Sequence, residues 1–445
     1  MKIFFGNGCA EALISGLSQS GNKHYIQHGA NLARRYLWTM QPGDLIITHC
    51  AGDPDYVCYV EDYCQYQRGS IKLISAYDGI DNFGLLNLKN LKTKKFFSKI
   101  EKYNFDEGSW HLEPFIADSD AFDFGNLINV PVRFGKWGTP SREAADLFND
   151  KRVFRALAAG LNVPIASGRV CATSEQLAFA LSELISATGS CIVKMDRHLG
   201  AEGNVLITHH HITNAPGTHK IYLVSDSQKY EDIAQTIYSE LGQGSSPCFI
   251  VEVYYHNAHS VGVHYLLGDK TVTLNGVADI RLAPAYAGMF WPTSLPDTVV
   301  HQLIAEGHKL AYHVASLGHR GPLSVDAIVC AGNQIIVNEI NARHGGFTAA
   351  KAVIDKITGS TAKSFFAATR AHLTSNMKFN VLRELLEQEG LSFNRNLGAG
   401  IVISAEDLQN TQQLEILTIA QSREAIHELE EKFINVACIN NIKGY

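Results

Sequence analysis

A group of strongly polar side chains follows an apolar, β-branched segment in the last third of the chain. The segment NQIIV leads into NEINARHGG, where Glu339, Asn341 and Arg343 stand at alternate positions. Successive side chains of a strand point to opposite faces, so these three are expected on one face. Two interpretations are open at this point. The group is either a solvated strand end or a site that binds a metal ion and phosphate.

A further carboxylate is expected beside this group. Asp326 lies in SVDAIV, and the turn AGN separates that predicted strand from IIVNEINA. A hairpin through the turn brings Asp326 close to Glu339, where the two charges would repel each other without a metal ion. Carboxylate and carboxamide oxygens are hard ligands that suit Mg²⁺ held jointly with the phosphates of ATP. Arg343 can stabilise a phosphoryl group or an oxyanion.

A lysine and two glycines form a second candidate site. Lys194 stands inside the buried-strand pattern CIVKM, so it must be paired or must reach a ligand. GNVLIT is the expected hairpin partner of that strand. The loop between them contains Gly200 and Gly203, which allow backbone N–H groups to face phosphate oxygens.

The segment FIVEVYY is a candidate for adenine binding. It reads as a strand whose backbone can meet the edge of a base, with Glu252 as an acceptor. Tyr254 and Tyr255 supply apolar walls.

The elements that must position these residues follow from the apolar pattern. KIFFG, GDLIITH and SIKLISA alternate with helical segments in the first third, which predicts an open α/β sheet. GNG at residues 6–8 is either a phosphate-binding turn or a plain tight turn. The lysine-rich segment 88–102 predicts an amphipathic helix with a solvated face, or a surface for a partner. Ser141 is expected to cap a helix, and residues 151–160 to form the next one. Antiparallel strands, a long helix over 296–318 and a helix after residue 345 complete the central region.

Composition limits the classes of function. The chain has 445 residues with 46% hydrophobic and 18% charged residues, so two or three globular domains are expected. A net charge of −6 provides no overall basic field for nucleic acid. No signal-peptide core or membrane span is expected, and nine scattered cysteines fit reduced thiols in a cytoplasmic protein. The run HHH at residues 209–211 is interpreted as an exposed loop rather than a metal site.

Taken in order, these motifs resemble the ATP-grasp superfamily. The matching pieces are NDKRVFRALAAGLNVPIASG, CIVKMDRHLGAEGNVLI, FIVEVYY, SVDAIV and VNEINARHGG. The resemblance implies an α/β (α+β) fold with a pre-ATP-grasp domain at 1–135, the ATP-grasp domain at 136–375 and a small α/β domain at 376–445. The whole layout is similar to peptide ligases of the pheganomycin type.

The resemblance implies a role for each matching residue. ATP would be bound by Lys151, Lys194, Gly200, Gly203, Glu252, Val253, Tyr254 and Tyr255. Mg²⁺, as two ions, would be held by Asp326, Glu339 and Asn341, and Arg343 would stabilise the transferred phosphoryl group. The position where relatives often carry a ribose-binding acid holds His259, which leaves the ribose contact in doubt. Arg281, Arg320 and the expected loop YAGMFWP (286–292) are candidates for substrate binding, and surface packing of the loop's aromatic residues is the alternative.

The expected activity is an ATP-dependent carboxylate–amine ligase. An acyl phosphate would form and an amine would then displace phosphate, so no nucleophilic side chain is needed. The substrates would be an amino acid or N-modified amino acid and an amine or short peptide. No nucleic acid or membrane partner is expected, and a homodimer is possible. Two alternatives stay open: ligation to a polyamine or protein side chain, and an ATP-binding regulatory protein without turnover.

Overall fold

The structure is a computed structural model of the whole chain. It describes every residue except 11–12, 14–28, 30–32, 79–83, 106–107, 199, 202, 226–228, 242–247, 360–363, 374–376, 438–440 and 443–445.

The first unit contains a parallel sheet in the order β3-β2-β1-β4, with parallel pairing at each step. Its strands are β1 (Lys2–Phe5), β2 (Leu45–Thr48), β3 (Lys72–Ser75) and β4 (His111–Pro114). Its helices are η2 (Arg35–Thr39), α3 (Pro54–Tyr63), α4 (Leu88–Leu91), α5 (Lys94–Ile100) and α6 (Ser119–Leu127). The predicted open α/β sheet is confirmed, and β4 is a strand that the sequence patterns did not indicate. GNG at 6–8 follows β1 and is tied to the segment after β4, because Asn7 Nδ2 donates to Ile116 O at 2.8 Å.

Two expectations about helices were wrong. The lysine-rich segment 88–102 forms two short helices, because Lys92 leaves helical geometry and Thr93 starts α5 by accepting a hydrogen bond from Phe96 N at 3.2 Å. Ser141 does not cap a helix. Its backbone N–H donates to Gly318 O at 2.8 Å, and α7 (Ala144–Phe148) begins after Glu143 without a side-chain cap. The predicted helix at 151–160 is α8 (Lys151–Gly160), capped by Asp150, which accepts from Arg152 N.

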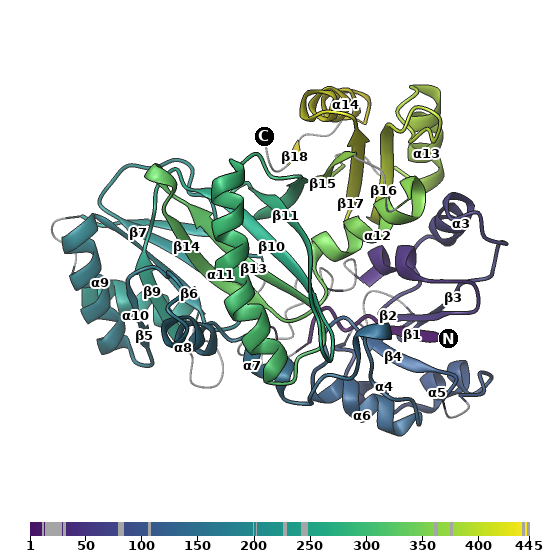
Figure 1. The fold of residues 1–445 in the computed structure, drawn as a ribbon, viewed down its shortest axis with the longest axis horizontal. Helices are drawn as coiled ribbons and strands as arrows, with labels where there is room; N and C mark the ends of the chain where they lie inside the picture. Colours follow the sequence, from purple (N-terminus) through teal and green to yellow (C-terminus); the bar gives the residue numbers. More distant parts are fainter. Residues whose placement is uncertain are drawn as a thin grey trace.

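The second sheet runs β5-β9-β6-β7-β8 and is covered on one face by two helices (Figure 1). Its strands are β5 (Gly168–Cys171), β6 (Ser190–Met195), β7 (Asn204–Thr208), β8 (Lys220–Leu223) and β9 (Phe249–Val253), and its helices are α9 (Ser174–Thr188) and α10 (Tyr230–Leu241). The predicted β6–β7 hairpin is confirmed, with Lys194 opposite Asn204.

The third sheet runs β14-β13-β10-β11-β12-β15-β17-β16, and β18 pairs with β15. Its strands are β10 (His259–Leu267), β11 (Val272–Leu282), β12 (Tyr286–Trp291), β13 (Gly321–Val329), β14 (Ile335–Asn341), β15 (Phe365–His372), β16 (Gly400–Asp407), β17 (Gln413–Ala420) and β18 (Asn441–Ile442). The associated helices are α11 (Asp297–Ser316), α12 (Gly346–Thr358), α13 (Phe379–Gln388) and α14 (Arg423–Val436). The segment 286–292, expected as a loop, is mostly strand β12, because its residues pair with β11 and β15 inside the sheet.

The first and last parts of the chain share one hydrophobic core. Buried side chains of the first unit, such as Trp38 and Tyr56, pack with residues of α12, β15, β16 and β17. The sheet also continues across residue 375, because β15 pairs with β17. The predicted domain boundaries stay predictions, and the shared core shows that the C-terminal strands do not form a separate layer.

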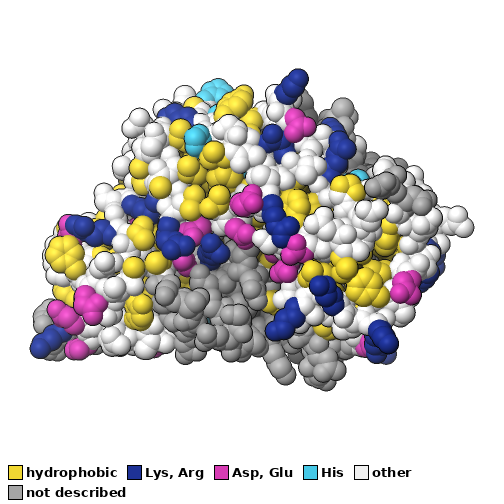
Figure 2. Space-filling model, turned by 90° about the horizontal axis from the view of Figure 1, so that it is seen from below, with side chains coloured by type: hydrophobic (Ala, Val, Ile, Leu, Met, Phe, Trp, Pro, Cys, Tyr) yellow, Lys and Arg dark blue, Asp and Glu magenta, His cyan; other side chains and the backbone are white. Residues whose placement is uncertain are grey.

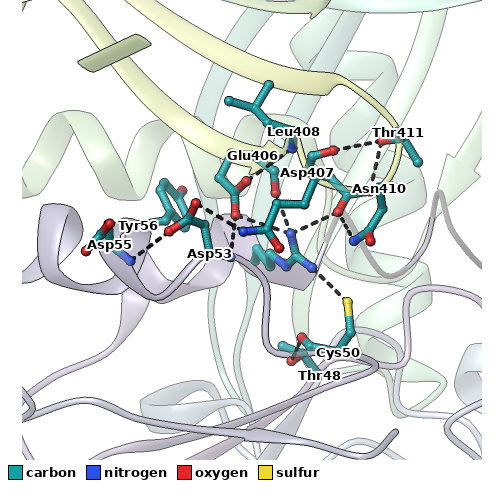
Figure 3. Close-up of polar contacts among 12 residues, drawn as sticks. Thr48, Cys50, Asp53, Asp55, Tyr56, Glu406, Asp407, Leu408, Asn410 and Thr411 are labelled. Carbon is teal, nitrogen blue, oxygen red and sulfur yellow. Dashed lines mark hydrogen bonds and ion pairs between the residues drawn. The ribbon is translucent and has the colours of Figure 1, made fainter. Parts of the chain in front are cut away.

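A buried ionic network joins the same two regions (Figure 3). The guanidinium of Arg34 donates to Glu406 O at 2.8 Å, to Asp407 Oδ1 at 3.1 Å and to Cys50 Sγ at 2.7 Å. The charged side chains of Arg34, Glu406 and Asp407 are at most 3% exposed. Two carboxylates and one guanidinium removed from water hold each other only while all partners are present.

The surface shown in Figure 2 mixes charges of both signs, with Lys and Arg interspersed among Asp and Glu. The described cysteines are free thiols. Among the described helices, none combines the length and the apolar composition that crossing a membrane requires.

Candidate active site

A cavity of about 870 Å³ is lined by residues of the second and third sheets and of the first unit. Most of the predicted site residues line it: Lys151, Lys194, Gly200, Glu252, Val253, Tyr254, Tyr255, Asp326, Glu339, Asn341 and Arg343. Four predicted residues are not among its lining: Gly203, His259, Arg281 and Arg320. The cavity therefore brings together motifs that lie far apart in the sequence.

The acidic group lies on two paired strands. Asp326 of β13 is the register partner of Glu339 of β14, and Ser324 is the partner of Asn341. The carboxamide of Asn341 donates to Asp326 Oδ2 at 2.9 Å and to Ser324 Oγ at 3.2 Å. The predicted hairpin is confirmed, and it places the two carboxylates side by side.

The electrostatics of this pair are asymmetric. Burial and the neighbouring Glu339 raise the pKa of Asp326, and Arg343 only partly offsets them. Burial would also raise the pKa of Glu339. The cations of Lys151, Lys194 and Arg343 outweigh it and hold that pKa below its usual value. Lys151 Nζ lies 3.0 Å from Glu339 Oε2.

The donor set fits Mg²⁺. Asp326, Glu339 and Asn341 offer oxygen atoms only, which hard divalent cations prefer, and a cation would relieve the repulsion that raises the Asp326 pKa. No group of three or more His, Cys, Asp or Glu side chains suited to a metal ion occurs in the described part of the chain. The third ligand here would be a carboxamide, which such a group does not include. The expectation of two ions stays a prediction.

Two lysines approach the cavity from different elements. Lys151 is the first residue of α8, and its backbone N–H donates to Asp196 O at 3.0 Å, which ties the helix start to the end of β6. Lys194 lies within β6, and its Nζ is 2.5 Å from Glu252 Oε2 of the neighbouring strand β9. Glu252 also forms an ion pair with Arg155. The lone lysine of the buried strand is thus paired and at the same time lines the cavity.

The glycine loop is described in part, because residues 199 and 202 lie outside the described residues. Gly200 lines the cavity and has φ +65°, a conformation that glycine adopts without strain. At Gly203 a Cβ atom would lie 2.7 Å from the ring of His198. Glycine at this position leaves room for the ring of His198, and the predicted contact of the loop with phosphate stays a prediction.

Both candidate substrate arginines lie outside the cavity. Arg281 donates to Glu430 at 2.8 and 3.1 Å and to Thr369, which anchors α14 to the sheet. Arg320 donates to Asp269 at 2.8 Å and to backbone carbonyls at the end of α11. Neither placement supports substrate binding, because each guanidinium has protein partners away from the acidic group.

His259 does not line the cavity either. Its Nε2 lies 2.8 Å from Asp279 Oδ1, and Asp279 further accepts from Arg423. The histidine therefore does not replace a ribose-binding acid in this arrangement. The exposed loop at 209–211 is confirmed, and two of its members, His210 and His211, lie at the cavity wall.

Several cavity residues were missed by sequence reasoning. They are Arg35 of η2, His264 of β10, His344 after β14 and Arg370 of β15. His264 is half-buried and stacks on Phe347 with ring centroids 4.1 Å apart, and the loss of contact with water lowers its pKa to about 3. No local pattern marks these residues, because they reach the cavity through long-range packing.

Models of known protein families match two parts of the chain. A sequence model of the Pre ATP-grasp domain matches residues 33–129, and one of the PGM1 C-terminal domain matches residues 382–433. A search of curated proteins found no match.

Solved structures align over nearly the whole chain. The biotin carboxylase from Campylobacter jejuni in complex with β-γ-ATP is 12% identical, with a TM-score of 0.60 over 99% of this chain and 92% of that one. N5-carboxyaminoimidazole ribonucleotide synthetase from Thermus thermophilus is 13% identical, with a TM-score of 0.57 over 98% of both chains. N5-carboxyaminoimidazole synthase from Aspergillus clavatus, in complex with ADP and 5-aminoimidazole ribonucleotide, is also 13% identical, with a TM-score of 0.56 over 98% of both chains. The likeness establishes an ATP-grasp fold with a pre-ATP-grasp domain at its start, which confirms the predicted fold class. The resemblance to pheganomycin-type ligases stays a prediction.

Proposed function

We propose that the protein is an ATP-dependent ligase that joins a carboxylate to an amine through an acyl phosphate and releases ADP and phosphate. One observation carries the proposal. The paired acids Asp326 and Glu339, with Asn341 and Arg343 beside them, face the same cavity as Lys151 and Lys194. Phosphoryl transfer needs little covalent help from a protein, and positioning and charge neutralisation are what such a site supplies.

The cavity offers a place for each part of ATP. At the end of β9, Val253, Tyr254 and Tyr255 line the wall with apolar surface and backbone groups that suit a purine edge. Lys194 and Lys151 supply positive charge to the phosphates, with Gly200 in the nearby loop. Mg²⁺ held by Asp326, Glu339 and Asn341 would neutralise charge on the phosphates. Two of the similar solved structures are nucleotide complexes, one with ADP and one with β-γ-ATP, which supports a nucleotide site here.

Two steps then form the product. A carboxylate oxygen attacks the γ-phosphorus, the bond from that phosphorus to the bridging oxygen breaks, and ADP leaves. The amine nitrogen attacks the acyl carbon, the carbon–oxygen bond breaks, and phosphate leaves with the bonding pair while the nitrogen loses a proton. The guanidinium of Arg343, held by Asn149 Oδ1, is placed to stabilise the charge that develops on the phosphoryl and acyl oxygens.

The test is ADP release from Mg²⁺-ATP with a panel of carboxylates and amines, singly and in pairs. The carboxylates would include amino acids, N-modified amino acids, short peptides and bicarbonate, and the amines would include amino acids, peptides and polyamines. We expect release that requires two substrates and a product lighter than their sum by one water, detected by mass spectrometry. Glu339→Gln should abolish release, whereas Glu306→Gln on the outer face of α11 should not. Tight nucleotide binding without turnover on the whole panel would contradict the proposal and favour a regulatory protein.

A further inference from the structure

The cavity extends beyond the acidic group to the start of α12. This helix has thirteen residues and begins after Gly345, without a side-chain cap and without an acidic residue in its first turn. Its first N–H groups therefore carry an uncompensated partial positive charge. Gly345, Gly346, Phe347 and Thr348 all line the cavity.

Two buried polar groups converge on this helix start. A Cβ atom at Gly346 would lie 2.5 Å from Tyr286 Oη and 3.5 Å from Arg35 Nη1. The Tyr286 hydroxyl and the Arg35 Nε are both buried and have no hydrogen-bond partner among the described residues. The Arg35 side chain is only 4% exposed, so its unpartnered nitrogen has little access to bulk water. Buried donors without partners are rare and costly, which points to a ligand that completes them.

The charges at this corner favour an anion. Arg370 lies over the ring of Tyr286, 4.6 Å from its centroid, and stands opposite Glu415 in the β15–β17 pairing. Glu415 is also the partner of Arg35, at 2.9 Å. Arg35 and Arg370 thus bring two positive charges to a corner that holds one carboxylate, and the helix start adds its partial positive charge. Burial and the nearby carboxylate of Glu415, opposed by the two arginines, raise the pKa of Tyr286 to about 12, so its hydroxyl stays protonated and can donate.

We propose that this corner, formed by Arg35, Tyr286, Arg370 and the first turn of α12, binds the free carboxylate of the amine substrate. The inference rests on the proposed ligase function and narrows its acceptor to a free amino acid or a short peptide. The carboxylate that becomes phosphorylated must lie beside the acidic group and Arg343. The corner begins only three residues later, so the Cα atoms of Arg343 and Gly346 are at most about 11 Å apart. An acceptor anchored there by its carboxylate can direct its amine toward the acyl phosphate.

Tyr286→Phe tests the pocket with little risk to the fold, because the hydroxyl it removes has no described partner. Each amine of the panel would be offered as the free acid and as its primary amide, for example L-alanine and L-alaninamide. We expect the wild type to prefer the acid by about tenfold or more in kcat/KM, since a site built for a charged group rejects an analogue that lacks it. Tyr286→Phe should reduce that preference severalfold, because KM should rise more for the acid than for the amide. Arg370→Gln should do the same more strongly.

Tyr265→Phe is the matched control. The Tyr265 hydroxyl is bonded to Ile304 O at 3.1 Å, and the residue does not line the cavity. This variant should lower Tm and keep the preference for the acid, whereas Tyr286→Phe should not lower Tm.

Failure of the pocket and failure of the ligase proposal give different results. Product formation with equal kcat/KM for acid and amide would overturn the pocket and keep the ligase. The enzyme could instead prefer donors that carry a second carboxylate and show no preference between acid and amide acceptors. That result would also overturn the proposal, because the corner would then bind the donor. If no pair turns over, the same acids and amides are compared by thermal shift with Mg²⁺-ADP. A rise in Tm with acids that Tyr286→Phe reduces would support the pocket, and no rise with any acid would overturn it.

Discussion

Asp326→Asn should make the ligand-free protein more stable while it removes activity. In the structure Asp326 is buried opposite Glu339, and both effects raise its pKa. A carboxyl group with a raised pKa in the folded state binds its proton more tightly than in the unfolded chain. Its contribution to stability is therefore present at low pH and is lost as pH rises from the pKa of the unfolded chain to the pKa of the folded state. At pH 8 the ionised carboxylate is a cost that asparagine removes, and Asn341 can still donate to the new carbonyl oxygen.

The size of the effect follows from proton binding. A tenfold change in the proton-binding constant corresponds to about 1.4 kcal/mol, so we expect a gain of roughly 1–3 kcal/mol in the free energy of unfolding at pH 8. The gain should shrink as pH falls toward 4, where the wild-type group is protonated in the folded state. Urea unfolding of the metal-free protein at both pH values measures it. Asp269→Asn, at a mostly exposed side chain, serves as the control, with little change at either pH.

The same variant should respond differently to ligand. Mg²⁺-ADP should raise the Tm of the wild type and raise that of Asp326→Asn far less, because a metal ligand is missing. ADP release should fall at least about a hundredfold. A variant that is less stable than the wild type at pH 8 without ligand would refute the reasoning, because the carboxylate would then not be strained by its neighbour.

Three further predictions concern other parts of the chain. Lys194→Met should weaken Mg²⁺-ADP binding by about tenfold or more in calorimetry, because a phosphate loses its cation while Glu252 keeps Arg155; an unchanged Kd would contradict the assignment. Arg34→Met should lower the free energy of unfolding by about 3–5 kcal/mol, since two buried carboxylates lose their partner, and a loss below about 1 kcal/mol in urea would show that the network is not holding the two regions. Burial would raise the pKa of Glu113, but nearby Lys2 and His344 outweigh it and hold that pKa at about 2. The Glu113 carboxylate therefore stabilises the fold at pH values above its pKa in the unfolded chain, and this stabilisation is lost as pH falls toward 2. Glu113→Gln should therefore lower Tm at pH 7 and differ less from the wild type near pH 2.

The parts of the site that the sequence predicted depend on neighbours along the chain. A turn of a few residues fixes which strand pairs with which, so the AGN turn was enough to place Asp326 beside Glu339, and the glycine loop was enough to pair β6 with β7. Short apolar runs separated by helical segments also indicated the strands of the first sheet correctly, apart from β4. These inferences require no knowledge of distant contacts.

The parts that failed depend on partners far away in sequence. Arg281 was a reasonable candidate for substrate binding until its partner Glu430, 149 residues later, came into view. The segment 286–292 looked like an aromatic loop because one of its partner strands, β15, follows only after α11, β13, β14 and α12. Arg35 reaches the cavity only because the first unit packs against α12 and β17. Local pattern cannot supply such contacts.

Transfer of oxygen from the carboxylate to phosphate tests the central claim most directly. A donor carboxylate labelled with ¹⁸O on both oxygens would be incubated with Mg²⁺-ATP and the acceptor amine. The masses of the released phosphate and of the product would then be measured by mass spectrometry. An acyl phosphate route predicts one ¹⁸O in the released phosphate, one retained in the amide, and ADP as the nucleotide product. Unlabelled phosphate, or AMP and pyrophosphate in place of ADP, would contradict it.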